Sequence, residues 1–152
     1  MVRYRKAKKN DLLQIAAIDR LVWIDNKSSE FIPDGEHVWR HWIDGAIVIC
    51  AYINTEIIGA AVAFPCIGNI FCVHKLFVQK DYRGKKIGTT LFEHILKKID
   101  IHKMDAYLTV DPENSVALKL YESHGFSEKK FIQGYYRKNE DRFILTRRYK
   151  KK

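Results

Sequence analysis

The 152 residues of this chain are 47% hydrophobic and 30% charged, a composition that fits an ordinary globular protein and excludes a disordered one. No apolar run is long enough to span a bilayer, and the first residues, Met1–Lys6, do not form a secretory signal. The formal net charge of +9 leaves an anionic partner as an alternative. We expect one domain over residues 1–152, in the cytoplasm and not in a membrane.

The basic charge and the cysteines carry little functional information. Much of the excess charge lies near the chain ends, and no basic stripe is interleaved with aromatic residues, so a nucleic-acid partner is only a minor alternative. Cys50, Cys66 and Cys72 have no C-x-x-C spacing and lie in apolar runs, which indicates reduced core residues. His37 and His41 have metal-ligand spacing, but the glutamate of an H-E-x-x-H motif is missing, so we expect no metal.

The first half of the chain is predicted to hold a strand, two helices and a hairpin. The predicted ranges are Val2–Lys6, a helix from Asp11 to about Val22 capped by Asn10, a helix from about Gly35 to Ile43 capped by Asp34, and the strands Ala46–Ile53 and Ile57–Phe64. A loop from Trp23 to Pro33, rich in aromatic, acidic and hydroxyl side chains, separates the two helices.

The second half alternates strands and helices before a final pair of strands. The predicted ranges are a strand Asn69–Val78, a helix ending at about Ile99, a strand Met104–Val110, a helix Asn114–His124, and the strands Phe126–Gln133 and Arg142–Tyr149. The resulting order β-α-α-β-β-β-α-β-α-β-β combines hairpins with strands joined by helices. It predicts an α/β fold with a mixed sheet and helices on both faces.

The turn between the predicted strand Asn69–Val78 and the helix that follows it is predicted to bind phosphate. A helix N-terminus leaves backbone N–H groups unpaired and carries a partial positive charge. Arg83, Lys85 and Lys86 crowd this turn, while Gly84 and Gly88 allow the backbone to come close to a ligand. These features favour a pyrophosphate-bearing cofactor.

Two sequence blocks carry a resemblance to a known superfamily. Arg83–Gly88 matches the phosphate-binding signature Gln/Arg-x-x-Gly-x-Gly/Ala except at Lys86, which replaces the first glycine. Asn114–Phe126 matches the segment Asn-x-x-Ala-x-x-Leu-Tyr-x-x-x-Gly-Phe without a break. The chain therefore resembles the GNAT (GCN5-related) N-acetyltransferases. The resemblance implies an α+β fold with a mixed, mostly antiparallel sheet of about six to seven strands and about four helices.

The resemblance also implies a binding site for acetyl-CoA as co-substrate, with no metal. Leu76, Phe77 and Val78 would pair with pantetheine, and the Leu76 N–H would face the thioester oxygen. Asn114 and Tyr121 would contact the cofactor from the second block. The pyrophosphate would be held by the backbone amides and cations of the turn, namely Arg83, Gly84, Lys85, Lys86, Ile87, Gly88 and Thr89. If the replaced glycine has a positive φ, a lysine there is strained.

The implied reaction transfers the acetyl group to a primary amine by direct attack in a ternary complex. Tyr121 would be the general acid that protonates the departing CoA thiolate. The general base is left open between His74, on the same strand face as Leu76, and an acid of the Trp23–Glu36 region: Asp25, Glu30 or Glu36. Cys72 lies at a base position of some relatives but is a poor base.

The acceptor is predicted to be a small-molecule or protein amine. Its binding residues would come from the loop between the first two helices, namely Trp23, Asp25, Glu30 and Phe31. Tyr135 and Tyr136, between the last two strands, border either this site or a partner subunit. Family members are often dimers, so a homodimer is expected. The alternatives from other classes are a non-catalytic acyl-CoA-binding module that senses the cofactor and a basic nucleic-acid-binding protein on the same fold.

Overall fold

The computed structural model describes residues 1–25 and 32–151. In this part of the chain, seven strands are hydrogen-bonded in the order β1-β2-β3-β4-β5-β7-β6. The pairs β1–β2, β2–β3, β5–β7 and β6–β7 are antiparallel, whereas β4–β5 is parallel, so the predicted mixed, mostly antiparallel sheet is confirmed. The elements are β1 (Arg3–Lys6), η1 (Lys9–Asp11), α1 (Leu12–Asp25), α2 (Glu36–Gly45), β2 (Ile47–Ile53), β3 (Glu56–Cys66), β4 (Ile70–Val78), η2 (Lys80–Tyr82), α3 (Ile87–Ile101), β5 (Asp105–Val110), α4 (Ser115–Ser123), β6 (Glu128–Ile132) and β7 (Arg142–Arg147).

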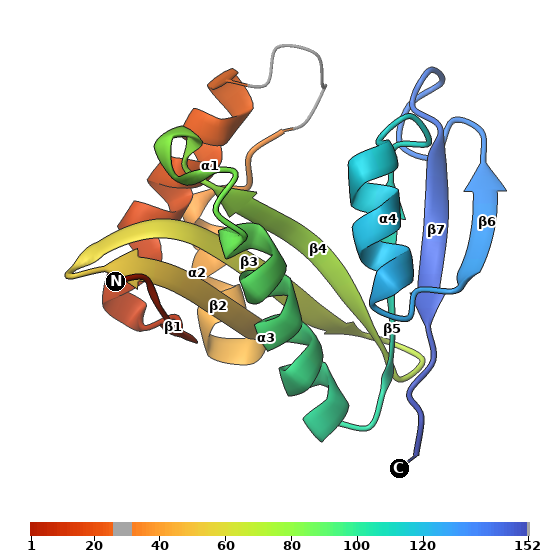
Figure 1. Cartoon of the computed structure of the whole chain (residues 1–152), viewed down its shortest axis with the longest axis horizontal. Coiled ribbons are helices and arrows are strands. Elements are labelled where there is room, and N and C mark those ends of the chain that lie inside the picture. Colours follow the sequence, from red (N-terminus) through yellow and green to blue (C-terminus); the bar gives the residue numbers. More distant parts are fainter. Residues whose placement is uncertain (26–31, 152) are drawn as a thin grey trace. The chain divides into compact units, whose positions relative to one another are not determined.

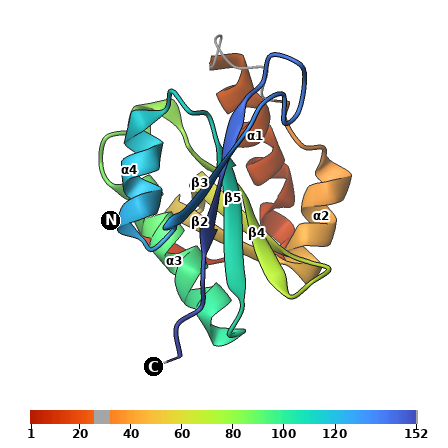
Figure 2. The ribbon, with the colours of Figure 1, turned by 90° about the vertical axis from the view of Figure 1, so that its right-hand side faces the viewer.

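The chain divides into two compact units, and the first has helices on both faces of its strands. This unit comprises Met1–Phe64 and Lys75–Lys98. Alternate residues of β2 point to opposite faces. Val48 and Cys50 belong to the core cluster that holds Trp39 of α2. On β3, a Cβ at Gly59 would meet Leu91 of α3 instead. Figures 1 and 2 show α2 and α3 on opposite sides of β2 and β3.

The second unit comprises Pro65–His74 and Ile99–Lys152. Its hydrogen-bonded strands are β5, β7 and β6, with the first residues of β4 paired to β5. Phe126 and Leu145 are fully buried and form the centre of its core with Ala106 and Leu108. Helix α4 runs alongside β7 (Figure 1).

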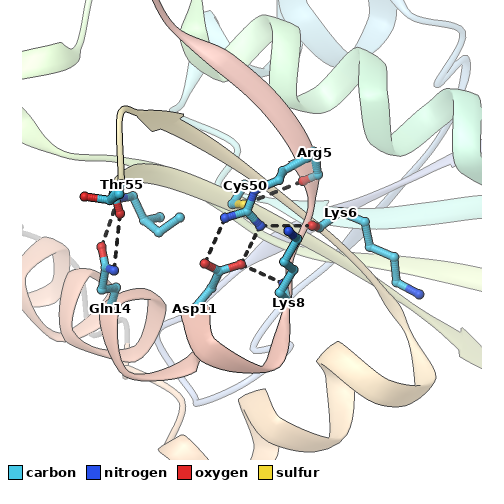
Figure 3. Close-up of polar contacts among 8 residues, drawn as sticks. Arg5, Lys6, Lys8, Asp11, Gln14, Cys50 and Thr55 are labelled. Carbon is cyan, nitrogen blue, oxygen red and sulfur yellow. Dashed lines mark hydrogen bonds and ion pairs between the residues drawn. The ribbon is translucent and has the colours of Figure 1, made fainter.

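The start of α1 is set by Asp11 and not by the predicted cap Asn10. The Asp11 carboxylate accepts the Lys8 backbone N–H (2.6 Å) and both Arg5 guanidinium nitrogens (2.6 and 3.0 Å), as Figure 3 shows. Asp11 is buried, so its carboxylate is surrounded by these donors and not by solvent. A single 3-10 turn, Lys9–Asp11, precedes the helix. Gln14 then ties α1 to the β2–β3 turn, because Gln14 Oε1 accepts the Ile57 N–H (2.9 Å).

Helix α1 also ends later than predicted. It continues to Asp25, so Trp23 and Asp25 are helical residues and not loop residues. The reason is local: no glycine or proline interrupts Leu21–Asp25, and these residues tolerate helical geometry. The predicted loop residues Glu30 and Phe31 lie outside the described residues.

Two further boundaries differ from the prediction. Helix α2 begins at Glu36, and its N-cap is Gly35, which has no side chain to cap the helix. The predicted cap Asp34 lies one residue earlier, and its carboxylate pairs with Lys75 (2.6 Å). Strand β6 begins at Glu128, because the amides of Phe126 and Ser127 donate back into the turn after α4, to the carbonyls of Tyr121 (3.2 Å) and Gly125 (3.0 Å). Cysteines also differ in burial: Cys50 and Cys72 are buried, but Cys66 is only partly buried. Within residues 1–25 and 32–151, no helix has the length and apolar character needed to cross a membrane.

Candidate acetyl-CoA site and active-site residues

The turn before α3 has two residues with left-handed backbone conformation. Gly84 has φ 75° and Lys86 has φ 60°. A Cβ at Gly84 would meet open space, so glycine is needed there for its conformation and not for room. Lys86 is a non-glycine residue in a region that L-residues rarely adopt, so the condition under which a lysine is expected to be strained at this position is met. The Lys86 carbonyl accepts the Thr90 N–H (3.0 Å) and therefore begins the helical hydrogen-bond ladder.

Gly88 allows α3 to pack closely on β4, because it has no side chain. A Cβ built at Gly88 would lie 3.3 Å from Leu76 Cδ2 and 3.8 Å from Val78 Cγ2. The N-terminal turn of α3 is thus packed directly on the strand segment predicted to bind pantetheine. The amides of Ile87, Gly88 and Thr89 have no intrahelical carbonyl partner, because they belong to the first turn of the helix. A phosphate-bearing ligand fits this arrangement.

The N–H group of Leu76 lies on the edge of β4 that faces away from β3. Gln79 N–H donates to Ile58 O on β3 (2.8 Å). Alternate residues of a strand direct their amides to opposite edges, so the amides of Leu76 and Val78 point to the other edge. Among the described residues, the parallel pairing on that edge covers Ile70–Cys72 and stops there. The Leu76 amide therefore points away from β3, and Leu76 lies beyond the residues of β4 that pair with β5.

The cations of the turn have different roles from one another. Arg83 Nε donates to the carbonyl of Val78 (3.0 Å), which fixes the turn to the end of β4. Lys85 Nζ donates to the Asp81 carbonyl (3.3 Å) and lies 5.4 Å from the centre of the Tyr82 ring. Lys86 is exposed next to the first turn of α3. Arg83 and Lys85 thus brace the backbone of this turn.

The second sequence block forms the start of α4 in the second unit. Asn114 is its N-cap, since Asn114 Oδ1 accepts the Ala117 N–H (3.1 Å). Tyr121 lies two turns further along, with its ring 6.3 Å from that of Phe126. Burial raises the pKa of the Tyr121 hydroxyl above its ordinary value. A phenol in this environment keeps its proton at neutral pH, as a general acid must.

The candidate bases on β4 are not equivalent. Burial raises the pKa of Cys72 to about 11, although a hydrogen bond with Tyr107 acts in the opposite direction. Cys72 is therefore a protonated thiol at neutral pH and cannot accept a proton. Tyr107 also reaches Cys66, with 3.9 Å between its hydroxyl and Sγ. His74 is exposed, two residues before Leu76 on the same strand.

The candidate acceptor residues Trp23 and Asp25 are exposed on the last turn of α1. Near them is a buried charged cluster that the sequence analysis did not identify: Lys75 of β4 bonds to Asp19 of α1 (2.9 and 3.1 Å) and to Asp34 (2.6 Å). Its one sequence signal was an acid at an apolar position of the first helix. Within the described ranges there is no group of three or more histidines, cysteines or acids that could hold a metal.

A comparison with protein families identifies the chain. The sequence profile of the Acetyltransferase (GNAT) family matches residues 14–126, which include both the basic turn and the Asn114–Phe126 block. The chain belongs to the GNAT acetyltransferase family. It is similar over nearly its whole length to N-alpha-acetyltransferases of two archaea. The protein of Saccharolobus solfataricus is 29% identical, with 94% of this chain and 90% of the relative covered. That of Sulfurisphaera tokodaii is 28% identical, with 95% and 91% covered.

Solved GNAT structures have the same fold. The ribosomal-protein-S18-alanine N-acetyltransferase of Escherichia coli superposes with a TM-score of 0.81 at 20% identity, over 100% of this chain and 96% of the other. A chain of the NatC complex bound to Gag peptide and CoA has a TM-score of 0.77 at 28% identity, over 98% and 99%. This GNAT protein is therefore an N-acetyltransferase, an acyltransferase that uses an amine acceptor, and the family implies acetyl-CoA as its acetyl donor.

Proposed function

We propose that this GNAT enzyme acetylates the α-amine at the N-terminus of a polypeptide. The two archaeal relatives that match its whole length are named N-alpha-acetyltransferases, and the NatC chain was solved with a peptide and CoA. The names of these relatives support a protein α-amine among the small-molecule and protein amines predicted from the sequence. The observation that carries the donor half of the proposal is the contact of Gly88 with Leu76 and Val78.

In this proposal the first unit binds the acetyl donor. Acetyl-CoA supplies an acetyl group as a thioester when bound. The amides of the first turn of α3 hold its pyrophosphate, and Phe77 and Val78 with Leu76 offer the β4 backbone to its pantetheine arm. The Leu76 N–H stabilises the negative charge that develops on the carbonyl oxygen. Asn114, the N-cap of α4, is a further candidate for a donor contact from the second sequence block.

Proton transfer completes the proposed reaction. The neutral amine forms a C–N bond with the acetyl carbon as the C–S bond to CoA breaks. Tyr121 gives its proton to the thiolate and is reprotonated by water, and the proton lost by the amine leaves through a base. The base remains open between His74 and the acids Asp25 and Glu36, with Glu30 outside the described residues.

The acceptor side of the proposal uses Trp23 and Asp25 together with Phe31, which lies outside the described residues. Tyr135 and Tyr136 are further candidates in the segment before β7. Their rings are perpendicular at 4.7 Å, and the Tyr136 hydroxyl is 2.7 Å from Thr109 Oγ1. An aromatic pair held in this way offers a firm surface for a peptide side chain.

Isothermal titration with acetyl-CoA, with desulfo-CoA and ATP as controls, tests the donor site. Activity is then measured on decapeptides that begin with Ser, Ala or Met, each with a free α-amine and one internal lysine. The matched controls are the same peptides with a blocked α-amine. We expect acetylation of the free peptides alone. Acetylation of the blocked peptides would show that the acceptor is the lysine side chain. Donor binding without transfer to any peptide, polyamine or aminoglycoside would favour a sensing module. Sedimentation of the same sample tests the predicted homodimer.

A further inference from the structure

A cluster of three charged residues lies inside the first unit, on the face of β4 opposite to the donor site. Lys75 Nζ is 2.9 and 3.1 Å from the two Asp19 oxygens and 2.6 Å from Asp34 Oδ2. The Lys75 and Asp19 side chains are 3% and 0% exposed, whereas that of Asp34 is 26% exposed. Three elements therefore meet in the cluster: β4, α1 and the residues that precede α2.

The polar groups of the cluster connect it closely to the backbone before α2. Asp19 Oδ2 accepts the Asp34 backbone N–H (2.9 Å) and the indole N–H of Trp39 (3.0 Å). Lys75 Nζ also donates to the carbonyl of Ile32 (3.5 Å). The side chain and the amide of Asp34 and the carbonyl of Ile32 are thus all held by two residues from distant parts of the sequence.

The position of Lys75 on β4 connects this cluster to the reaction. Lys75 directly precedes Leu76, and neighbouring residues of a strand point to opposite faces. The contact of Leu76 with Gly88 places Leu76 on the α3 face, so Lys75 points to the α1 and α2 face. In the proposed function the acceptor residues Trp23 and Asp25 come from α1, the helix on this same face whose Asp19 bonds to Lys75. The segment that Lys75 holds lies on that face.

We propose that Lys75 is a positioning residue for the acceptor: with Asp19, it fixes residues 32–34 against β4, and this fixed segment forms one wall of the peptide site. The inference rests on the proposed function. Two carboxylates and one ammonium stabilise a core less than apolar side chains of similar volume would, since buried ion pairs contribute little net stability. What the cluster provides is a definite place for a short segment that has no regular structure of its own.

Asp34→Asn is the most direct test, because Asp34 is the least buried member of the cluster and its substitution removes one ion pair without a large change of shape. We expect the KM for the best decapeptide to rise about tenfold while kcat and the Kd of acetyl-CoA stay within about twofold. Hydrogen exchange of the amides in residues 32–36 should accelerate about tenfold, with β4 and α3 unchanged. The matched control is Asp44→Asn, which removes the exposed Arg40–Asp44 pair (2.6 Å) of α2.

The double variant Lys75→Met/Asp19→Asn separates positioning from stability. It removes one charge of each sign, so it should recover most of the melting temperature lost in Lys75→Met, where the two carboxylates lose the ammonium that they share. Because residues 32–34 lose their ammonium anchor, we expect the peptide KM and the exchange of residues 32–36 to stay raised. Recovery of KM together with the melting temperature would overturn the inference.

The exchange measurement needs no activity, so the two proposals can fail separately. Unchanged exchange of residues 32–36 in both Asp34→Asn and the double variant would overturn the positioning role, whatever the enzyme acetylates. Accelerated exchange with no effect on peptide KM would also overturn it. A wild-type protein that acetylates none of the peptides would instead reject the proposed function and its acceptor wall, while the exchange result would still decide whether the cluster holds the segment.

Discussion

Gly88 of α3 lies directly against Leu76 of β4, so close that an added Cβ would be 3.3 Å from Leu76 Cδ2. This contact brings the unpaired amides of a helix N-terminus next to the strand backbone that is directed away from β3. A ligand with a pyrophosphate and an extended, amide-containing arm can bind both at once. The relationship explains why the second glycine of the family signature is retained here although the first is not.

Gly88→Asp should abolish most acetyl-CoA binding. The new carboxylate must either displace Leu76 or project toward the phosphates, and a negative charge at this helix terminus repels an anionic ligand. We expect the Kd of acetyl-CoA to rise at least about tenfold, measured by isothermal titration. The control is Gly45→Asp, because a Cβ at Gly45 has no neighbour within 4 Å. Equal affinity of the two variants would mean that the ligand does not bind at the start of α3.

Lys86→Gly should stabilise the protein and weaken donor binding at the same time. A left-handed φ costs a non-glycine residue about 1–2 kcal/mol, and the added chain entropy of glycine offsets part of this gain. We expect the free energy of unfolding in urea to increase by about 1 kcal/mol. The Kd of acetyl-CoA should rise several-fold in low salt, because an exposed cation beside the phosphates is lost.

Lys85→Gly is the control for this pair of effects. Lys85 is exposed in the same turn and is not among the described residues with positive φ, so glycine brings no relief of strain there. It should lower the free energy of unfolding slightly and lose the contact with Tyr82. If both variants lose stability by the same amount, the backbone at Lys86 carries no strain.

The fold was largely predictable because its elements follow local patterns. Continuous runs of β-branched and apolar residues indicated β2 and β3, and Asn54, which has φ 53°, supplied the left-handed residue of the turn between them. The two family blocks then predicted which residues would face the donor. Boundaries were less predictable where a distant partner decides them: Asp34 was expected to cap α2, but Lys75, 41 residues later in the chain, takes its carboxylate.

The charged cluster could not have been assembled from the sequence. Asp19 was visible only as an acid among the apolar residues of the first helix, and nothing in the sequence shows that it meets Lys75. The same holds for Arg83, whose bond to the Val78 carbonyl involves a backbone atom that has no sequence signature. Side-chain-to-backbone bonds of this kind cannot be predicted from a sequence motif.

Tyr121→Phe should lower kcat about 100-fold or more and leave the Kd of acetyl-CoA nearly unchanged, because it removes one proton donor and little volume. Burial raises the pKa of Tyr121 above the ordinary value of about 10, so the phenol stays protonated from neutral pH to beyond pH 10. The wild-type rate should therefore not fall through loss of this proton below about pH 10.

The matched control is Tyr52→Phe, a partly buried tyrosine of β2 that lies under Arg5. Its kcat should equal that of the wild type. Equal turnover in Tyr121→Phe would remove Tyr121 from the mechanism. A decline of the wild-type rate well below pH 10 that persists in Tyr121→Phe belongs to another group.

Arg5→Met should destabilise the protein in a pH-dependent way. Burial opposes ionisation of Asp11, but the hydrogen bonds from Arg5 and Lys8 outweigh it and lower the pKa of the carboxyl. The Asp11 side chain is 9% exposed, so the variant leaves a largely buried charge without its bidentate partner. Because Arg5 is 28% exposed, we expect a loss of about 2 kcal/mol in the free energy of unfolding at pH 7, less than for a fully buried pair.

The sign of the pH dependence follows from the lowered pKa. A depressed carboxyl pKa contributes stability above the unfolded value of about 3.9, and this contribution is lost as the pH falls through the folded value. Urea unfolding of wild type and Arg5→Met should therefore differ most at pH 7 and converge below about pH 4. Arg3→Met, an exposed arginine on the same strand, should show no such convergence. A constant difference at all pH values would assign the effect of Arg5 to its packing over the Tyr52 ring, 4.7 Å away, and not to the ion pair.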